Sequence, residues 1–277
     1  MENNSKTTIS NLERVIFYED GHKYLGEESG LRYESVSGVN KKILAPDIDW
    51  DGILHRKAER LGISPQELQD RWDKAKVEGT EAGTAVHNFY ENKYYEQEYY
   101  CWWFDEYKVV RCETEGDKKF QRFGLEPGHV YPECILSLVK GHMRIAGQSD
   151  AIFVDDKGYI HITDIKTDKE ISYKGFTPWR GREQCMKPPF DHIGDCNFNH
   201  YTHKMSTYMF MALQANPELK AGTITLEYKP IERDDTGLPV WGADGLPIVK
   251  SHSEINVGYN EKLVKDVLNE YYKITNI

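Results

Sequence analysis

The stretch from Gly147 to Thr167 decides the fold, and it reads GQSDAIFVDDKGYIHITDIKT. Two apolar runs, at 152–154 and 160–165, flank the turn-forming sequence DDKG at 155–158. Apolar and β-branched residues on both sides of a short, glycine-containing turn are typical of a β-hairpin. We therefore predict an antiparallel pair of strands here, joined by a tight turn.

The polar residues of this hairpin can converge. Side chains alternate between the two faces of a strand, so Asp164 and Lys166 share one face while Ile165 points into the core. Asp150 opens the partner strand, and pairing across the turn brings it close to Asp164. Carboxylate oxygens suit Mg²⁺ or Mn²⁺, and a nearby lysine can bind a phosphate or orient an attacking water. The alternative is a solvated strand face with an ordinary ion pair, because Asp-x-Lys is a common pattern.

Composition limits the classes of protein. The chain has 277 residues, 39% of them apolar, which is enough for a sizeable core. It lacks the roughly twenty consecutive apolar residues of a membrane span, and residues 1–10 are polar, so we expect a soluble, cytoplasmic protein. The net charge of −10 argues against a protein that coats nucleic acid non-specifically, but it is compatible with a local basic channel.

A basic segment follows directly on the hairpin. Between Lys166 and Lys187 the basic residues outnumber the acidic ones, against the trend of the whole chain. Several prolines and glycines predict an irregular loop over 168–199. A basic loop of this length is a candidate nucleic-acid contact, and its candidate residues are Lys174, Arg180 and Arg182.

Two helices are expected upstream. Ser64, followed by proline and by Glu67 three residues later, is a capping-box signal for a helix start. Gly79 and Gly83 are expected to interrupt this helix before a second one begins. The predicted division of the chain follows this break, with an N-terminal hairpin and helical part at 1–78 packed on a core at 79–277.

The second helix carries a candidate metal ligand. Gly83, His87 and Glu91 are spaced four apart and share one helical face. A lone helical histidine is more often structural than a ligand. The densely aromatic run at 94–104 predicts core packing or a partner-facing surface, with base stacking as the alternative.

The other expected elements follow from periodicity and turn signals. They are a strand pair within 14–33, a short helix capped by Ser35 or Ser37, a helix over 50–61, a loop or frayed helix over 113–128, strands over 133–139 and 142–146, a helix over 201–213, and a C-terminal hairpin (223–231 and 253–257) and helix capped by Asn260. Glu133 lies at a strand start, where it either approaches the hairpin's carboxylates or remains an ordinary edge charge.

An ordered set of short motifs resembles a known family. The set is GTAVHNFYE at 83–91, Gly147-x-x-Asp150, DIKT at 164–167 and a helix containing Tyr208. It resembles the PD-(D/E)XK nuclease superfamily, specifically its RecB-like and phage-exonuclease branch, over roughly 79–213. The N-terminal hairpin also looks like that of phage-encoded members. The resemblance implies an α/β fold with a restriction-endonuclease-like core, in which helices flank a central mixed β-sheet.

The resemblance also implies roles for individual residues. By position, His87, Asp150 and Asp164 would be ligands of Mg²⁺, for which Mn²⁺ can substitute. The Ile165 carbonyl would add another oxygen, and Lys166 would be the catalytic lysine. Glu133 is a further candidate ligand.

Two family features differ in this chain. Members commonly have Gln-x-x-x-Tyr on the helix after the active-site strands, and here the matching positions are Lys204 and Tyr208. A lysine at that position can still meet a phosphate of DNA. Some relatives hold an iron–sulfur cluster with four cysteines, but the spacing of the five cysteines here does not match, so we expect no cluster.

The expected function is a Mg²⁺-dependent DNA nuclease, foremost an exonuclease in phage-type recombination, repair or genome processing. A structure-specific endonuclease on the same fold is the second candidate. The third is a nucleic-acid-binding protein that keeps the fold without catalysis. The presence of His87, Asp150, Asp164 and Lys166 argues against it, because a decayed site would be expected to lose at least one of them. The expected partner is DNA rather than a membrane, and a second copy of the chain or a recombination protein remains open as an additional partner.

Overall fold

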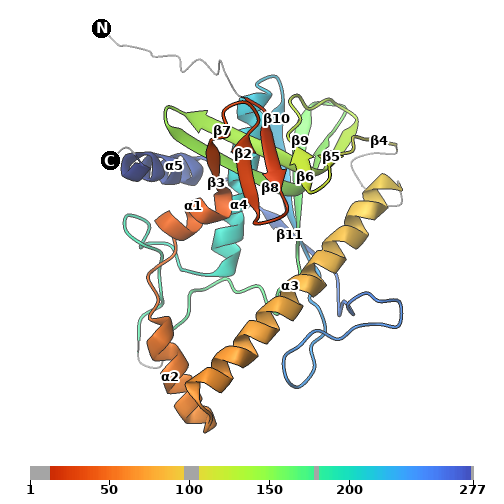
Figure 1. The fold of residues 1–277 in the computed structure, drawn as a ribbon. Coiled ribbons are helices and arrows are strands. Elements are labelled where there is room, and N and C mark those ends of the chain that lie inside the picture. Colours follow the sequence, from red (N-terminus) through yellow and green to blue (C-terminus); the bar gives the residue numbers. More distant parts are fainter. Residues whose placement is uncertain (1–12, 97–105, 178–180, 276–277) are drawn as a thin grey trace.

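The computed structural model describes residues 13–96, 106–177 and 181–275. Within them, eleven strands form one mixed sheet in the order β11-β10-β9-β8-β3-β2-β1-β6-β5, with β7 paired to β8 and β4 paired to β7 (Figure 1). The strands are β1 (Val15–Tyr18), β2 (Lys23–Gly26), β3 (Arg32–Ser35), β4 (Lys108–Val109), β5 (Glu113–Glu115), β6 (Lys118–Phe120), β7 (His129–Lys140), β8 (Met143–Val154), β9 (Tyr159–Lys166), β10 (Lys220–Tyr228) and β11 (Ser253–Val257).

Helices cover both faces of this sheet. In the described residues they are α1 (Val36–Ile43), α2 (Trp50–Leu61), α3 (Pro65–Tyr95), α4 (Asn197–Ala215) and α5 (Glu261–Thr275). Ile160 and Ile162 of β9 belong to the main core with α1, α4 and α5. Ile165 of the same strand packs instead against Ala82 and Val86 of α3. The expected α/β fold with a mixed sheet flanked by helices is therefore confirmed.

The predicted central hairpin is present as β8 and β9. The two strands pair antiparallel from Ala151 opposite Thr163 to Val154 opposite Ile160. Asp155 closes the turn, since its Oδ1 accepts hydrogen bonds from the backbone N–H groups of Lys157 and Tyr159 at 2.9 and 2.8 Å. On its other side β9 pairs parallel with β10, and α4 makes the crossover between them. The hairpin thus lies inside the sheet, buried by helices on both faces.

The expected helix break at Gly79 and Gly83 is wrong. A single helix, α3, runs for 31 residues through both glycines, and Ser64 caps it as predicted. A helical glycine costs about 1 kcal/mol relative to alanine, which the packing of α3 on the sheet outweighs. Gly83 serves this packing, because a Cβ there would lie 3.3 Å from Thr167 Oγ1. The predicted boundary between an N-terminal part (1–78) and a core (79–277) therefore falls inside one helix.

Two strand assignments also differ from expectation. The charged segment 113–128, expected as a loop or frayed helix, contains the β5–β6 hairpin, which turns at Gly116 with φ +61°. Pairing of β6 with β1 stabilises this hairpin despite its charged residues. The strand expected at 142–146 and the first strand of the central hairpin are one continuous strand, β8.

The helix caps at Ser35 and Asn260 are confirmed. The described residues between 168 and the start of α4 at Asn197, which exclude 178–180, are irregular, as expected. In the part of the chain that the structure describes, no helix is both long enough and apolar enough to cross a membrane. Most of the aromatic run at 94–104 and Arg180 lie outside the described residues.

Candidate metal centre and nucleic-acid interface

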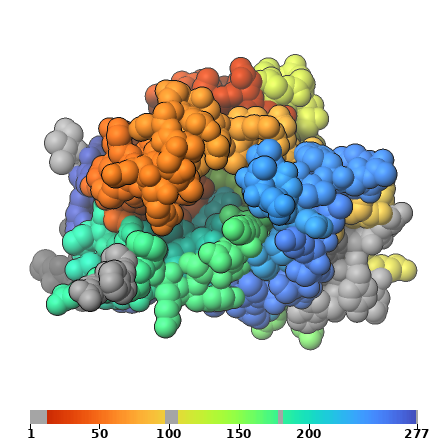
Figure 2. Space-filling view, turned by 90° about the horizontal axis from the view of Figure 1, so that it is seen from below, coloured from red at the N-terminus to blue at the C-terminus, as the bar shows by residue number. Residues whose placement is uncertain are grey.

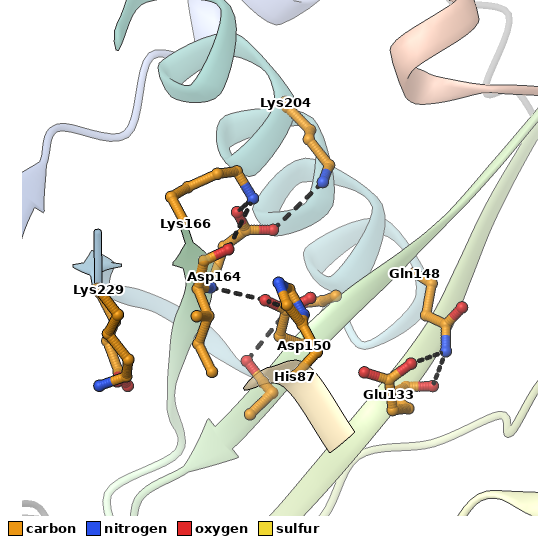
Figure 3. Close-up of polar contacts among 12 residues, drawn as sticks. His87, Glu133, Gln148, Asp150, Asp164, Lys166, Lys204 and Lys229 are labelled. Atoms are coloured by element: carbon orange, nitrogen blue, oxygen red, sulfur yellow. Dashed lines mark hydrogen bonds and ion pairs between the residues drawn. The ribbon is translucent and has the colours of Figure 1, made fainter. Parts of the chain in front are cut away.

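His87, Glu133 and Asp150 meet at the centre of the site. They come from α3, β7 and β8, and their ligand atoms all lie within 4.8 Å of one another. His87 Nδ1 is 3.3 Å from Asp150 Oδ2, and both side chains are largely buried. Figure 3 shows the two side chains facing each other beneath the end of β9. One imidazole nitrogen and two carboxylates suit a divalent cation, so the donor set fits the expected Mg²⁺ or Mn²⁺.

Asp164 lies on the other side of Asp150 and is held by two lysines (Figure 3). Its Oδ2 accepts a hydrogen bond from Lys166, and its Oδ1 lies 3.2 Å from Lys204 Nζ. Asp164 is fully buried, so the alternative of a solvated strand face is wrong. Lys166 Nζ also donates to the Ile165 carbonyl oxygen at 3.0 Å. The two lysines thus bind the oxygens that were predicted as ligands from Asp164 and Ile165.

A hydrogen bond links Asp150 to the backbone of the strand that carries Asp164. Asp150 Oδ2 accepts a hydrogen bond from the Ile165 N–H at 2.6 Å. Burial would raise the pKa of Asp150, but His87 and the ammonium groups of Lys166 and Lys204 hold it well below its usual value. The Asp150 charge in turn raises the pKa of His87. Asp150 is therefore a carboxylate at any physiological pH and an anionic donor at the centre of the cluster.

Glu133 is a buried member of the site rather than an edge charge. Its side chain is 15% exposed. Burial and the neighbouring Asp150 charge raise its pKa to about 7, against the opposing effect of Lys119. Gln148 donates a hydrogen bond to its Oε2. Glu133 has a φ of +51°, a left-handed conformation that is uncommon for a residue other than glycine. Backbone strain of this kind is concentrated at functional sites.

Lys204 and Tyr208, one turn apart on α4, occupy different environments. Lys204 reaches Asp164, and it lies 5.4 Å from the centre of the Tyr208 ring. Burial would lower the pKa of Lys204, but Asp164 and Tyr208 raise it well above its usual value. Tyr208 is only 3% exposed and packs on Gly147, where a Cβ would lie 2.6 Å from the ring. Tyr208 therefore supports Lys204 from the core, and Gly147 provides the space for its ring.

The basic segment 168–199 lies beside the site. Figure 2 shows a hollow between the orange surface of α2 and α3 and the green and teal surface of this segment. Lys174 and Arg182 are exposed on the segment. A pocket of about 230 Å³ adjoins Lys204, and its lining residues are Ser37, Asn40, Lys41, Ala45, His200, Tyr201 and Lys204. Lys41 and Lys204 thus line a pocket that adjoins the Asp164 carboxylate.

Lys119 and the buried pair of Glu227 and Lys229 are charged neighbours of the site that the sequence interpretation missed. Lys119 comes from β6, in a segment expected to be a loop or a frayed helix, and its Nζ lies 3.4 Å from Glu133 Oε2. Lys229 Nζ lies 2.8 Å from Glu227 Oε2, and both side chains are 1% exposed. No local pattern marks these three residues. Gln148 lies inside the Gly147-x-x-Asp150 motif, which gave the only available signal for it.

The comparisons with known proteins assign this chain to no family. No family model matches the chain, and no curated protein matches it. A solved structure described as "Crystal structure of SSO0001" aligns at 15% identity with a TM-score of 0.25, over 52% of this chain and 50% of that one. The chain thus spans about half the length of that structure. A likeness at this level carries no argument about fold or function.

Proposed function

We propose that the protein is a Mg²⁺-dependent DNA nuclease with a restriction-endonuclease-like core. The observation that carries the proposal is the convergence of His87 and Asp150 with the Asp164–Lys166 pair on adjacent elements of one buried site. The resemblance of the motifs to the PD-(D/E)XK superfamily assigns the same residues. We propose further that it acts as an exonuclease on DNA ends in phage-type recombination, repair or genome processing.

The metal would be held by oxygen donors and one imidazole. Asp150, Asp164 and the Ile165 carbonyl would supply the oxygens, with Glu133 as a further carboxylate beside Asp150, and His87 would supply the nitrogen. When bound, the ion supplies an activated water and charge stabilisation for the non-bridging oxygens of the scissile phosphate. The buried carboxylates suit this role because Asp150 is ionised and fixed by the N–H of Ile165.

Lys166 and Lys204 act on the phosphate and the attacking water. Both ammonium groups converge on Asp164, from β9 and from α4. An ammonium at this position can orient the water or neutralise the negative charge that develops on the phosphate. Lys204, at the position of the family's glutamine, offers charge instead of an amide and binds the phosphate next to the scissile bond.

The basic segment binds the DNA backbone. Lys174 and Arg182, which are exposed on this segment, would neutralise phosphates of the DNA. The sequence adds Arg180, which lies outside the described residues, as a further candidate. Phosphate contacts of this kind give affinity without sequence preference. This arrangement agrees with an enzyme that degrades DNA irrespective of its sequence.

The test is incubation of the purified protein with linear duplex, circular duplex and single-stranded DNA, each in Mg²⁺, Mn²⁺ or EDTA. We expect short products from linear DNA in either metal, intact circular duplex, and no cleavage in EDTA. Cleavage of circular duplex would instead assign an endonuclease. Absence of metal-dependent cleavage on every substrate would overturn the proposal.

A further inference from the structure

Two aromatic side chains are exposed on the basic segment 168–199. Phe176 is 70% exposed, and Tyr173, three residues before it, is 57% exposed. Leaving two such rings in water forfeits the stabilisation that their burial would supply. Large rings that are exposed so close together in the chain are a candidate binding surface.

The backbone beneath these rings is fixed by side chains. Asn197, the first residue of α4, accepts a hydrogen bond from the Ser172 N–H at 2.7 Å and donates one to the Glu170 carbonyl oxygen at 2.8 Å. The Gly175 N–H, between the two rings, donates to Glu183 Oε1 at 2.7 Å. A fixed backbone lowers the conformational entropy that the rings would lose on binding a ligand.

A line of contacts connects Tyr173 to Lys166 and Lys204. The Tyr173 ring centre lies 4.7 Å from that of Phe198 on α4. Tyr201 is three residues from Phe198 and three from Lys204, and residues three apart are neighbours on a helix surface. Lys166 Nζ lies 5.1 Å from the centre of the Tyr201 ring. Six residues of helix span about 9 Å, so the exposed rings begin close to the two lysines.

The charges of the segment favour a nucleic acid as its ligand. Lys174 lies between the two rings in the sequence, Arg182 follows them, and both are exposed. Two acidic side chains of the segment are engaged within the protein, since Asp168 Oδ2 accepts from the Tyr201 hydroxyl at 2.7 Å and Glu183 holds the backbone. Surfaces that bind single strands combine cations for the phosphates with aromatic rings for the bases. In a duplex the bases stack on one another, so only unpaired bases can cover these rings.

We propose that the basic segment binds an unpaired DNA strand, whose bases stack on Tyr173 and Phe176 while its phosphates contact Lys174 and Arg182. The inference rests on the proposed function, because it names the form of DNA that reaches the metal centre. An enzyme acting on a duplex end would separate the terminal base pairs, and stacking on the rings offsets part of the cost of unstacking them.

The test compares two strands of equal length by fluorescence anisotropy in EDTA, where we expect no cleavage. One is a single-stranded oligonucleotide, and the other is an abasic strand, which has the phosphates but no bases. The wild type should bind the intact strand more tightly. Tyr173→Ala and Phe176→Ala should each weaken binding of the intact strand by about fivefold or more and leave the abasic strand unchanged. Tyr173→Phe and Phe176→Tyr, which keep the rings, should retain wild-type affinity.

Two control variants separate stacking from other effects. Phe123→Ala removes a ring that is 46% exposed outside the segment, between β6 and β7, and should bind both strands like the wild type. Lys174→Met should weaken both strands alike and reduce the dependence of affinity on salt, because a phosphate contact releases counterions. The two alanine variants at the rings should leave that salt dependence unchanged.

Equal affinity of the wild type for the intact and abasic strands would overturn the inference, and this result needs no variant to fold. Unchanged binding of the intact strand by both ring variants would also overturn it and would assign the rings to docking of a partner protein. Failure of the proposed function looks different. A wild type that prefers the intact strand and cleaves no DNA would refute the nuclease and keep the strand-binding surface.

Discussion

Glu227 and Lys229 form a buried ion pair that joins the helix and the strand carrying the site. Lys229 Nζ is 2.8 Å from Glu227 Oε2 and 4.1 Å from the centre of the Tyr90 ring on α3. Tyr90 is three residues beyond His87 on that helix. The Lys229 backbone N–H donates to the Lys166 carbonyl oxygen at 2.8 Å. Breaking this pair should therefore loosen the contact between α3 and the end of β9.

The magnitude follows from burial. Both side chains are 1% exposed, so Lys229→Met removes the ammonium group that lies 2.8 Å from the buried Glu227 carboxylate. Removing one partner of a buried pair costs about 3–5 kcal/mol of unfolding free energy. His252 lies 3.7 Å from Glu227 Oε2, but it is 49% exposed and replaces little of the lost interaction. Replacing both charged residues with apolar ones should cost much less than the sum of the single changes, since the double variant buries neither charge.

Urea-induced unfolding measures this difference, and the chain offers a matched control. Lys262 lies 2.6 Å from Asp266 on α5, but these side chains are 87% and 45% exposed. An exposed pair of this spacing contributes about 0.3–0.5 kcal/mol, so Lys262→Met should change the unfolding free energy very little. If Lys229→Met costs no more than Lys262→Met, the reasoning from burial is refuted.

Three further predictions concern the site itself. Lys166→Ala should slow single-turnover DNA cleavage by on the order of a hundredfold or more while DNA affinity in Mg²⁺ remains, and an unchanged rate would exclude a catalytic lysine. His87→Ala should reduce cleavage with better rescue by Mn²⁺ than by Mg²⁺, whereas equal loss in both would indicate a structural histidine. Because the pKa of Glu133 is raised from 4.5 to about 7, its contribution to the stability of the metal-free protein is complete below pH 4.5 and is lost as the pH rises through 7. Glu133→Gln should remove this loss from unfolding curves measured across that range, and an unchanged pH dependence would contradict the raised pKa.

Turn and helix-cap signals predicted much of the fold, because each of these features is determined by residues that are neighbours in the sequence. The turn at 155–158 and its flanking apolar runs defined the central hairpin, and Ser64 and Asn260 marked two helix starts. Alternation along the strand placed Asp164 and Lys166 on one face and Ile165 in the core, as the structure confirms. Each of these features is set within a few residues of sequence.

Tertiary contacts decided the elements that were predicted wrongly. Gly83 is a helix-weakening residue in isolation, but in the structure it allows α3 to approach Thr167. The charged residues of β6 have little strand preference, and their pairing with β1 makes them a strand. Lys119 was missed for the same reason, since only the folded sheet brings it to Glu133, 14 residues away. Of the two lysines that contact Asp164, Lys166 lies on the same strand and was expected near it, whereas Lys204 comes from α4 and only the folded structure brings it there.

The central claim is that Asp150 and Asp164 hold a metal ion that cleaves DNA. Its most direct test is single-turnover degradation of an end-labelled linear duplex in Mg²⁺ by the wild type, Asp150→Asn and Asp164→Asn, with Mn²⁺ binding measured on the same samples. Removing one anionic oxygen removes charge that a hard cation requires, so both variants should lose cleavage and bind Mn²⁺ more weakly, and the wild type should lose cleavage in EDTA. Cleavage at close to the wild-type rate by either variant would contradict the account.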